Sequence, residues 1–322
     1  MNSALKNYAA YVNNKIDVCE ISLNQYISTD NILQNKQGIE CAASLPIQGG
    51  KVTAFKKGDI LLANIRPYLK KIWYAQFDGG CSADVLAIRA NAKTDSHFLF
   101  YALFRDDFFI HAMKGAKGTK MPRGDKTQIM EFKIPVFDLK TQQSIAAVLS
   151  ALDKKIALNK QINARLEEMA KTLYDYWFVQ FDFPDANGKP YKSSGGDMVF
   201  DETLKREIPK GWGSIELQSC LAKIPNTTKI LNKDIKDFGK YPVVDQSQDF
   251  ICGFTNDEKS ILNPQDAHII FGDHTRIVKL VNFQYARGAD GTQVILSNNE
   301  RMPNYLFYQI INQIDLSSYG YA

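Results

Sequence analysis

The sequence predicts a mixed α/β protein in which one long helix joins two similar domains. Three observations support this fold class. Short β-rich runs broken by glycine and proline lie on both sides of the centre of the chain. Between them, apolar residues recur with a heptad period over residues 139–178. Finally, a segment that begins at Asp59 has a similar counterpart that begins at Asp266.

The first domain is predicted to span residues 1–138. An aromatic, helix-like run at residues 97–110 is expected to pack in its core, and a basic glycine-containing loop follows that run. The β-rich runs that predict its strands are residues 59–65, 71–77, 85–88 and 132–136.

The long helix is predicted over residues 139–183, with Thr141 as its N-cap and the polar Gln142 and Gln143 in its first turn. Forty helical residues would form a rod of roughly 60 Å. Two heptad rows form an apolar seam, which a coiled-coil partner would cover. The rows are Ile145, Leu152, Asn159, Leu166 and Leu173, and Leu149, Ile156, Asn163, Ala170 and Trp177.

Two polar residues interrupt this seam. Buried asparagines at Asn159 and Asn163 would fix the register of a helix pair at a cost in stability. Alternatively, both side chains face solvent or a partner subunit. The seam as a whole predicts a subunit interface, either with another protein or by self-association of the chain.

A polar connector is predicted over residues 184–207 and a second domain over residues 208–322. The repeat supports the second domain, because 266 − 59 and 308 − 101 both give an offset of 207. An offset that recurs about 40 residues later indicates tandem duplication. The first copy continues for 178 − 101 = 77 residues beyond Tyr101, whereas only 322 − 308 = 14 follow Tyr308. We therefore expect the second domain to be incomplete.

Composition limits the kinds of site that the chain can carry. The net charge is only +4, so any nucleic-acid surface must be local. Five scattered cysteines without a C-x-x-C motif indicate reduced thiols in a cytoplasmic protein rather than a zinc module. The four histidines show no metal-ligand spacing, so no metal is expected. The sequence contains no apolar run of the roughly 18 residues that a membrane span requires.

The strongest candidate site is the loop of residues 114–126, in which five cations face a single acid, Asp125. Lysine neutralises phosphates, arginine can pair with guanine, and glycines let backbone N–H groups approach a phosphate. The loop therefore predicts DNA contacts, although a solvated flexible loop would have the same composition. The predicted contacts are Lys114, Lys117, Lys120, Arg123 and Lys126.

A second cluster follows the strand that begins at Asp59, and it has a counterpart in the repeat. Different polar side chains at equivalent turns would suit the reading of different bases. Alternatively, Arg66 and Arg276 form ion pairs with nearby acids such as Asp59 and Asp273. Arg287, beside a glycine, is a weaker candidate. The cluster consists of Arg66, Tyr68, Lys70 and Lys71 in the first domain and of His274, Thr275 and Arg276 in the second. The predicted DNA contacts among them are the basic residues Arg66, Lys70, Lys71, His274 and Arg276.

The long helix also carries a motif. Residues 142–156 read Gln-x-x-Ile-Ala-x-x-Leu-Ser-x-Leu-Asp-x-x-Ile, residues 158–163 read Leu-Asn-x-x-Ile-Asn, and residues 166–170 read Leu-Glu-x-Met-Ala. In this order the three motifs resemble the central conserved region of type I restriction-modification specificity subunits. The phrase Ile-Pro-Lys-Gly-Trp at residues 208–212 is similar to the phrase that commonly opens a recognition domain in that family.

This resemblance implies two target-recognition domains on a helical spacer, reading a bipartite asymmetric site in double-stranded DNA. It implies a non-catalytic chain without a cofactor of its own. S-adenosylmethionine would be bound by modification subunits, and ATP and Mg²⁺ by a restriction subunit. The seam would then be the surface that a second conserved helix and the modification subunits cover.

Two other functions remain open at this stage. The chain could be a coiled-coil assembly module whose domains bind protein, or the recognition fragment of a fused restriction–modification enzyme. The sequence contains no P-loop, no methyltransferase Asn-Pro-Pro-Tyr or Asp-Pro-Pro-Tyr motif and no glycine-rich cofactor loop, which weighs against an enzyme fragment.

Overall fold

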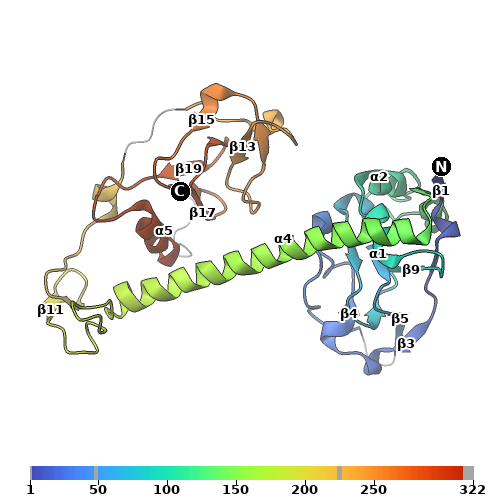
Figure 1. Ribbon diagram of the computed structural model, residues 1–322, viewed down its shortest axis with the longest axis horizontal. Helices are drawn as coiled ribbons and strands as arrows, with labels where there is room; N and C mark the ends of the chain where they lie inside the picture. Colours follow the sequence, from blue (N-terminus) through green and yellow to red (C-terminus); the bar gives the residue numbers. More distant parts are fainter. Residues whose placement is uncertain (1, 47–49, 223–226, 315–322) are drawn as a thin grey trace. The chain divides into compact units, whose positions relative to one another are not determined.

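A computed structural model describes residues 2–46, 50–222 and 227–314. The chain divides into two compact units, Met1–Ile162 and Asn163–Ala322, and helix α4 (Leu139–Tyr174) runs from the first into the second (Figure 1). Mixed sheets and helices in both units confirm the predicted fold class.

Unit 1 contains two four-stranded sheets, in the orders β2-β9-β6-β7 and β3-β5-β8-β4, and a separate β1–β10 pair. Its strands are β1 (Asn2–Ala4), β2 (Ala9–Tyr11), β3 (Lys15–Asp17), β4 (Tyr26–Ile27), β5 (Lys51–Phe55), β6 (Ile60–Ala63), β7 (Ile72–Tyr74), β8 (Gly79–Cys81), β9 (Val85–Ala90) and β10 (Lys133–Pro135). Its shorter helices are α1 (Ser96–Leu103), α2 (Asp106–Lys114) and α3 (Lys126–Met130).

Strand β6 is buried on both faces, as its unbroken apolar sequence requires. Ile60 and Leu62 pack with the helices in one core, and Leu61 faces the opposite core with Trp73. This alternation follows from the two-residue period of a strand. The predicted aromatic run lies in the first core, where Phe108 is fully buried, so the prediction that it packs internally is confirmed.

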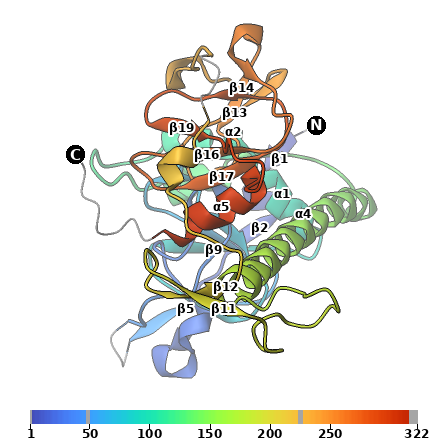
Figure 2. The same ribbon diagram turned by 90° about the vertical axis from the view of Figure 1, so that its left-hand side faces the viewer.

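Unit 2 contains sheets in the orders β14-β13-β18-β15 and β17-β16-β19. Helix α5 (Asn304–Gln313) packs against β16 and β17 through Phe307 and Ile311 (Figure 2). The strands of these two sheets are β13 (Tyr241–Val244), β14 (Gly253–Thr255), β15 (Ile261–Leu262), β16 (His268–Gly272), β17 (Val278–Val281), β18 (Tyr285–Arg287) and β19 (Thr292–Ile295).

The two units repeat one topology, as the sequence predicts. Strand β8 pairs in parallel with β4 and antiparallel with β5, and β18 pairs in the same way with β13 and β15. Strand β6 lies between β9 and β7, just as β16 lies between β19 and β17. The Ile60–Ile88 pair corresponds to Ile269–Ile295, giving offsets of 209 and 207. The offset of 207 therefore holds for the later strand, whereas the earlier one is shifted by two residues.

Helix α4 confirms the predicted rod and begins at residue 139 as predicted, but its N-cap differs. The α-helix ends at Tyr174 and a π-helical turn, Asp175–Val179, follows it, so the helix stops short of the predicted residue 183. Asp138 is the capping residue, because its carboxylate accepts from the backbone N–H of Thr141 at 2.8 Å. Thr141 donates its hydroxyl back to Asp138 at 3.0 Å, so Thr141 lies in the first turn and is not the N-cap. A carboxylate also interacts favourably with the N-terminal end of the helix dipole.

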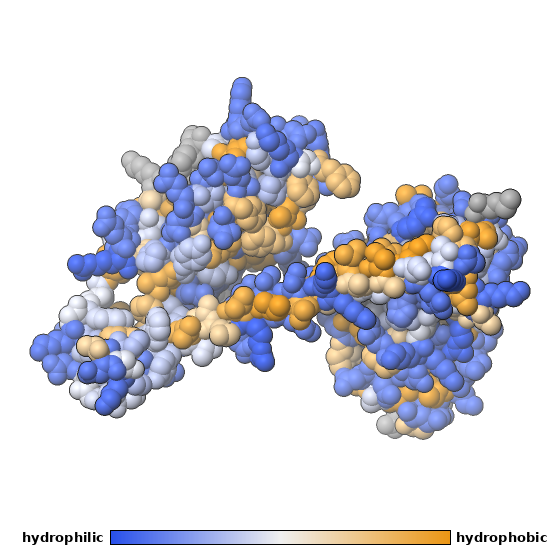
Figure 3. Space-filling model, in the orientation of Figure 1, coloured by the Kyte–Doolittle hydropathy of each residue, from blue (hydrophilic) through white to orange (hydrophobic). Residues whose placement is uncertain are grey.

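The seam of α4 is largely exposed. Ile145 and Leu149 are half-buried, whereas Leu152, Ile156, Leu166 and Leu173 are 47–56% exposed. Asn159, Asn163 and Trp177 are exposed as well. Figure 3 shows apolar surface along this helix. The described part of the chain therefore leaves the seam uncovered, and the register role of the two asparagines stays a prediction.

The predicted connector carries regular structure of its own. Strands β11 (Met198–Asp201) and β12 (Arg206–Pro209) form a hairpin in which Val199 pairs with Ile208. The ring of Trp212 stacks on that of Phe183 with centroids 5.1 Å apart, and the ring centroids of Phe178 and Phe181 lie within 5.7 Å of it. The connector and the Ile-Pro-Lys-Gly-Trp phrase thus form one aromatic-centred module with the end of α4.

Candidate nucleic-acid interface

The basic loop of unit 1 is a short β-like ribbon rather than an irregular loop. Lys117 and Arg123 exchange two backbone hydrogen bonds, each 2.9 Å long. Gly118 turns the chain with a φ of +99°, a left-handed conformation that favours glycine. Residues 117–121 at the tip of this ribbon are all exposed.

The base of the ribbon is fixed by the loop between β6 and β7. The backbone N–H of Arg66 donates to the carbonyl of Pro122 at 2.7 Å, and that of Gly124 donates to the carbonyl of Asn64 at 3.0 Å. A Cβ at residue 124 would lie 2.8 Å from Asn64 Oδ1, so the Asn64 side chain would have to shift to admit any residue larger than glycine. The two clusters that the sequence predicts separately in unit 1 therefore lie together.

The cations of the ribbon differ in their partners. The guanidinium of Arg123 pairs with Asp84 at 2.8 Å. Within the described ranges, Lys114, Lys117, Lys120 and Lys126 form no ion pair within 4.0 Å, and all four are exposed. These four lysines are accordingly available to phosphates.

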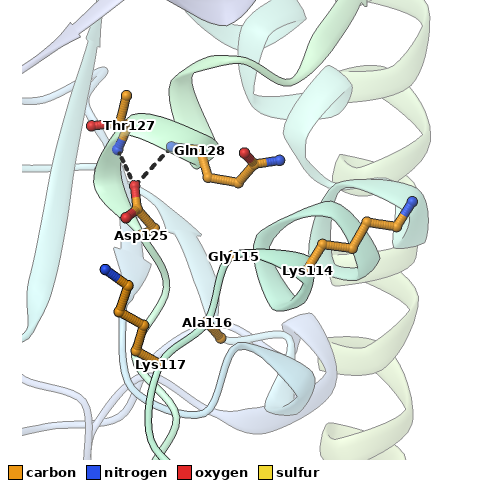
Figure 4. A pocket seen from close by; sticks show the side chains of 7 residues that line it. All are labelled: Lys114, Gly115, Ala116, Lys117, Asp125, Thr127 and Gln128. Carbon is orange, nitrogen blue, oxygen red and sulfur yellow. Dashed lines mark hydrogen bonds between the residues drawn. The ribbon is translucent and has the colours of Figure 1, made fainter.

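The single acid of the loop is committed to capping α3. Asp125 Oδ1 accepts from the backbone N–H groups of Gln128 at 2.9 Å and Thr127 at 2.8 Å. The hydrogen bond from Gln128, then that from Thr127 and the charge of Lys117, hold the pKa of Asp125 below its usual range. A surface hollow of about 550 Å³ opens here, lined by Lys114, Gly115, Ala116, Lys117, Asp125, Thr127 and Gln128 (Figure 4).

In the β6–β7 loop, Arg66 and Lys70 flank a short turn in left-handed conformations, with φ of 52° and 51°. Lys70 pairs with Asp106 at 3.1 Å, and Lys71 donates to the carbonyl of Thr29 at 2.6 Å. Both lysines therefore have structural partners, whereas the side chain of Arg66 has none within the described ranges. The proposed pairing of Arg66 with Asp59 does not occur.

Asp59, which is buried, instead pairs with the partly exposed Arg89. Its two carboxylate oxygens accept from Arg89 Nε and Nη2, each at 2.7 Å, in a bidentate pair. Asp59 precedes β6 and Arg66 follows it, so the two side chains belong to opposite ends of this strand.

The corresponding loop of unit 2 is three residues shorter and contains His274 and Arg276. The N–H of Ala63 donates to the carbonyl of Lys71, and the N–H of Gly272 donates to that of Ile277. The residue before each acceptor is Lys70 in unit 1 and Arg276 in unit 2, and both have a φ between 50° and 60°. Arg66 and Arg276 thus lie in equivalent hairpins, but the residue that matches Arg276 in register is Lys70.

A comparison with protein-family models assigns residues 6–168, just over half of the chain, to the type I restriction modification DNA specificity domain. The chain belongs to this family. The matched residues include the ribbon, the β6–β7 loop and most of α4. The candidate residues of unit 2 lie outside the match.

Curated relatives of this specificity domain resemble part of the chain. It is 34% identical over 168 residues to the type I restriction enzyme HindI specificity subunit of Haemophilus influenzae, covering 49% of this chain and 36% of the relative. It is 32% identical over 123 residues to the EcoDI specificity subunit of Escherichia coli, covering 37% and 27%. The matches thus span about a third or less of the length of these relatives.

A solved structure supports the fold of both units. The S subunit of a type I restriction-modification system from M. genitalium superposes with a TM-score of 0.51 over 97% of this chain and 76% of that one. The sequence identity is 16%, so the likeness concerns the fold alone.

In this specificity-domain protein, Arg287 is not an accessible DNA contact. It lies on β18 and is only 8% exposed, and its Nε is buried without a hydrogen-bond partner in the described part of the chain. Arg287 therefore offers little surface to a phosphate or base edge in this conformation. Its position beside a glycine gave no sign of this burial, which it shares with the other two residues of β18.

Gln142 is a positioning residue whose structural role the sequence did not reveal. Its side chain joins the start of α4 to the N-terminus of α1, because Oε1 accepts from the backbone N–H of Asp95 at 2.9 Å. Tyr101 of α1 strengthens this junction by donating to Asp153 of α4 at 2.7 Å. Both Gln142 and Asp153 are fixed positions of the helix motif. Their place in the motif is the sequence signal that could have pointed to this junction between α4 and α1.

Across the described ranges, no group of three or more His, Cys, Asp or Glu residues is arranged to hold a metal ion. No helix among the described residues is both long and apolar enough to cross a membrane.

Proposed function

We propose that this chain is the DNA-specificity subunit of a type I restriction-modification system. Unit 1 would read one half of a bipartite asymmetric site in double-stranded DNA and unit 2 the other half. The observation that carries the proposal is the convergence of two basic loops at one edge of unit 1, where four lysines and Arg66 lack ionic partners within the described ranges. Unpaired cations beside a fixed ribbon suit phosphate binding.

The chain itself would not be catalytic. A modification subunit would supply S-adenosylmethionine-dependent methyl transfer, and a restriction subunit would supply ATP- and Mg²⁺-dependent translocation and cleavage. Such a complex would act on DNA in the cytoplasm. Support comes from the family match and from the names of the relatives, which describe specificity subunits of type I enzymes.

A salt titration of DNA binding tests the proposal. The quadruple variant Lys114→Ala, Lys117→Ala, Lys120→Ala and Lys126→Ala, assembled with the modification subunit, should bind duplex DNA with a flatter dependence of log K on log salt. Each lost phosphate contact should reduce the slope by about 1. The matched control exchanges four exposed cations elsewhere in the chain, Lys154, Lys160, Lys171 and Lys189, for alanine.

If the folded quadruple variant kept the slope of the wild-type chain, the ribbon would not be the DNA contact. If the wild-type complex showed no salt-dependent DNA binding, the function itself would be refuted.

A protein-binding assembly module is the second candidate, and the exposed seam of α4 favours it. In that case both units would bind protein, and DNA affinity would be weak and independent of the ribbon lysines. The salt titration separates the two functions because binding to phosphate releases counterions.

A further inference from the structure

The tip of the ribbon carries a side chain that phosphate binding does not explain. Met121 is 53% exposed and lies between Lys120 and Pro122, with Lys117 and Arg123 at the paired end of the ribbon. A thioether has no attraction to a phosphate. Single exposed apolar residues are common on proteins, but this one stands at the tip of the most basic segment of the chain.

The ribbon presents this tip rigidly. Pro122 and Gly124 are buried, and the carbonyl of Pro122 accepts the 2.7 Å hydrogen bond from Arg66. The ion pair between Arg123 and Asp84 adds a third attachment at the base. Because these contacts fix the backbone next to Met121, binding would have to order little more than its side chain.

A two-stranded ribbon can enter the major groove of DNA, which is about 12 Å wide and 8.5 Å deep. The turn of this ribbon consists of the residues between the paired Lys117 and Arg123. It is tight, because a Cβ on Gly118 would lie 3.3 Å from the carbonyl oxygen of Met121. Met121 and the exposed lysines are therefore presented together at one end of the ribbon.

We propose that Met121 is a specificity-determining residue that packs against the C5-methyl group of a thymine in the major groove. This inference rests on the proposed DNA-binding function. The thymine methyl is the apolar group among the hydrogen-bonding atoms of the major-groove base edges. A methionine side chain is flexible and polarizable, so it suits contact with such a group.

Replacing thymine by deoxyuridine removes only this methyl group and therefore tests the contact directly. The full chain with its modification subunit first selects its half-sites from randomised duplex DNA, and deoxyuridine then replaces each thymine in turn. At one position, the wild-type complex should lose affinity by about fourfold, the effect of one buried methyl-sized group.

The Met121→Ala variant should bind thymine and deoxyuridine at that position equally well, whereas Met121→Leu should keep a preference for thymine. Met169→Ala is the matched control, since Met169 is also an exposed methionine but lies on α4. This control variant should behave like the wild-type chain.

Three results would overturn the inference: no sensitivity of the wild-type complex to deoxyuridine at any position, equal sensitivity in Met121→Ala, or a half-site without A·T pairs. The first result together with a sharp DNA bend would identify Met121 as a wedge between base steps instead. If the wild-type complex bound no duplex at all, the proposed function would be refuted. If it bound its site but ignored the thymine methyl groups, only the methyl contact of Met121 would be refuted.

Discussion

Gln142 shows how much of unit 1 depends on one buried polar side chain. It is 1% exposed, and its carboxamide accepts from Asp95 N–H and donates to the carbonyl of Phe137 at 2.9 Å. Buried polar groups in native proteins nearly always have such partners. The side chain therefore fixes the first turn of α4 to the segment that enters it and to the start of α1.

We expect Gln142→Leu to lower the free energy of unfolding of the chain by about 3 kcal/mol, because it leaves a buried N–H and a buried carbonyl without partners. Urea denaturation would measure the effect. Gln143→Leu is the matched control, since Gln143 is the exposed neighbour. Equal stability of the two variants would show that water or backbone rearrangement replaces the lost hydrogen bonds.

A half-buried histidine gives unit 2 a predicted response to acid. His268 lies 3.1 Å from the Tyr285 hydroxyl, and burial holds the pKa of His268 below its ordinary value, an effect that Asp266 partly opposes. Between the lowered pKa and the ordinary value of about 6.5, the unfolded chain binds more protons than the folded chain. The free energy of unfolding should therefore fall as the pH falls through this window.

The His268→Gln variant should lose this part of the pH dependence, as followed by thermal melting between pH 7 and pH 5, the range in which an ordinary histidine titrates. His274→Gln, at an exposed position of the same unit, serves as the control. A pH profile of His268→Gln that matched the wild type would assign the acid response to other groups.

At the residue scale, the sequence marks the segment that forms the ribbon, but it does not show which of the other candidate cations are paired or buried. Charge and glycine content mark residues 114–126 without any knowledge of the fold. The partners of Arg66 and Lys71 depend on tertiary contacts, as in the hydrogen bond from Lys71 to Thr29, which spans 42 residues. The burial of Arg287 depends likewise on tertiary contacts, because all three residues of β18 are buried.

At the scale of elements, periodic segments were the most predictable. The heptad pattern located α4 and its start, but Asp138 caps the helix in place of Thr141, and the helical segment ends at Val179 rather than at residue 183. The repeat located the equivalent hairpins, and the shift of two residues in β16 reflects insertions and deletions that a single offset cannot describe. The aromatic module around Trp212 was missed, because its rings come from segments without a common period.

The exposed seam of α4 leads to a prediction about association. Leu152→Glu and Ile156→Glu place charges on the apolar stripe and should weaken either self-association or capture of the modification subunit, since charged groups are costly to bury. Sedimentation at tens of micromolar would measure both. Leu158→Glu is the matched control, because Leu158 is equally exposed but lies outside both heptad rows. A wild-type chain that remained monomeric and bound the modification subunit equally well with any of the three substitutions would rule out the seam as an interface.

At the scale of the whole molecule, the repeated topology and the continuous helix suggest separate roles for the two units and for the helix. Each unit has its own sheets and cores, so each can vary its loops without disturbing the other. The helix between them is regular, with 36 residues in the α conformation. A regular helix changes its length by a fixed amount per residue, so under the proposed function its length would set the distance between the two DNA half-sites.

Duplicating residues 152–158 within α4 tests this idea. Seven added residues extend a helix by about 10.5 Å and turn it by nearly two full turns, so the seam keeps its direction. Since base pairs are spaced by about 3.4 Å, the gap of the recognised bipartite site should grow by about three base pairs while both half-sites stay the same. Mapping of methylated sites in a host genome would reveal the new gap. Insertion of seven residues between Asn187 and Gly188, in an exposed turn closed by the pairing of Pro184 with Pro190, is the control and should leave the gap unchanged. An unchanged gap in the duplicated-helix variant, with methylation retained, would show that α4 does not set the spacing.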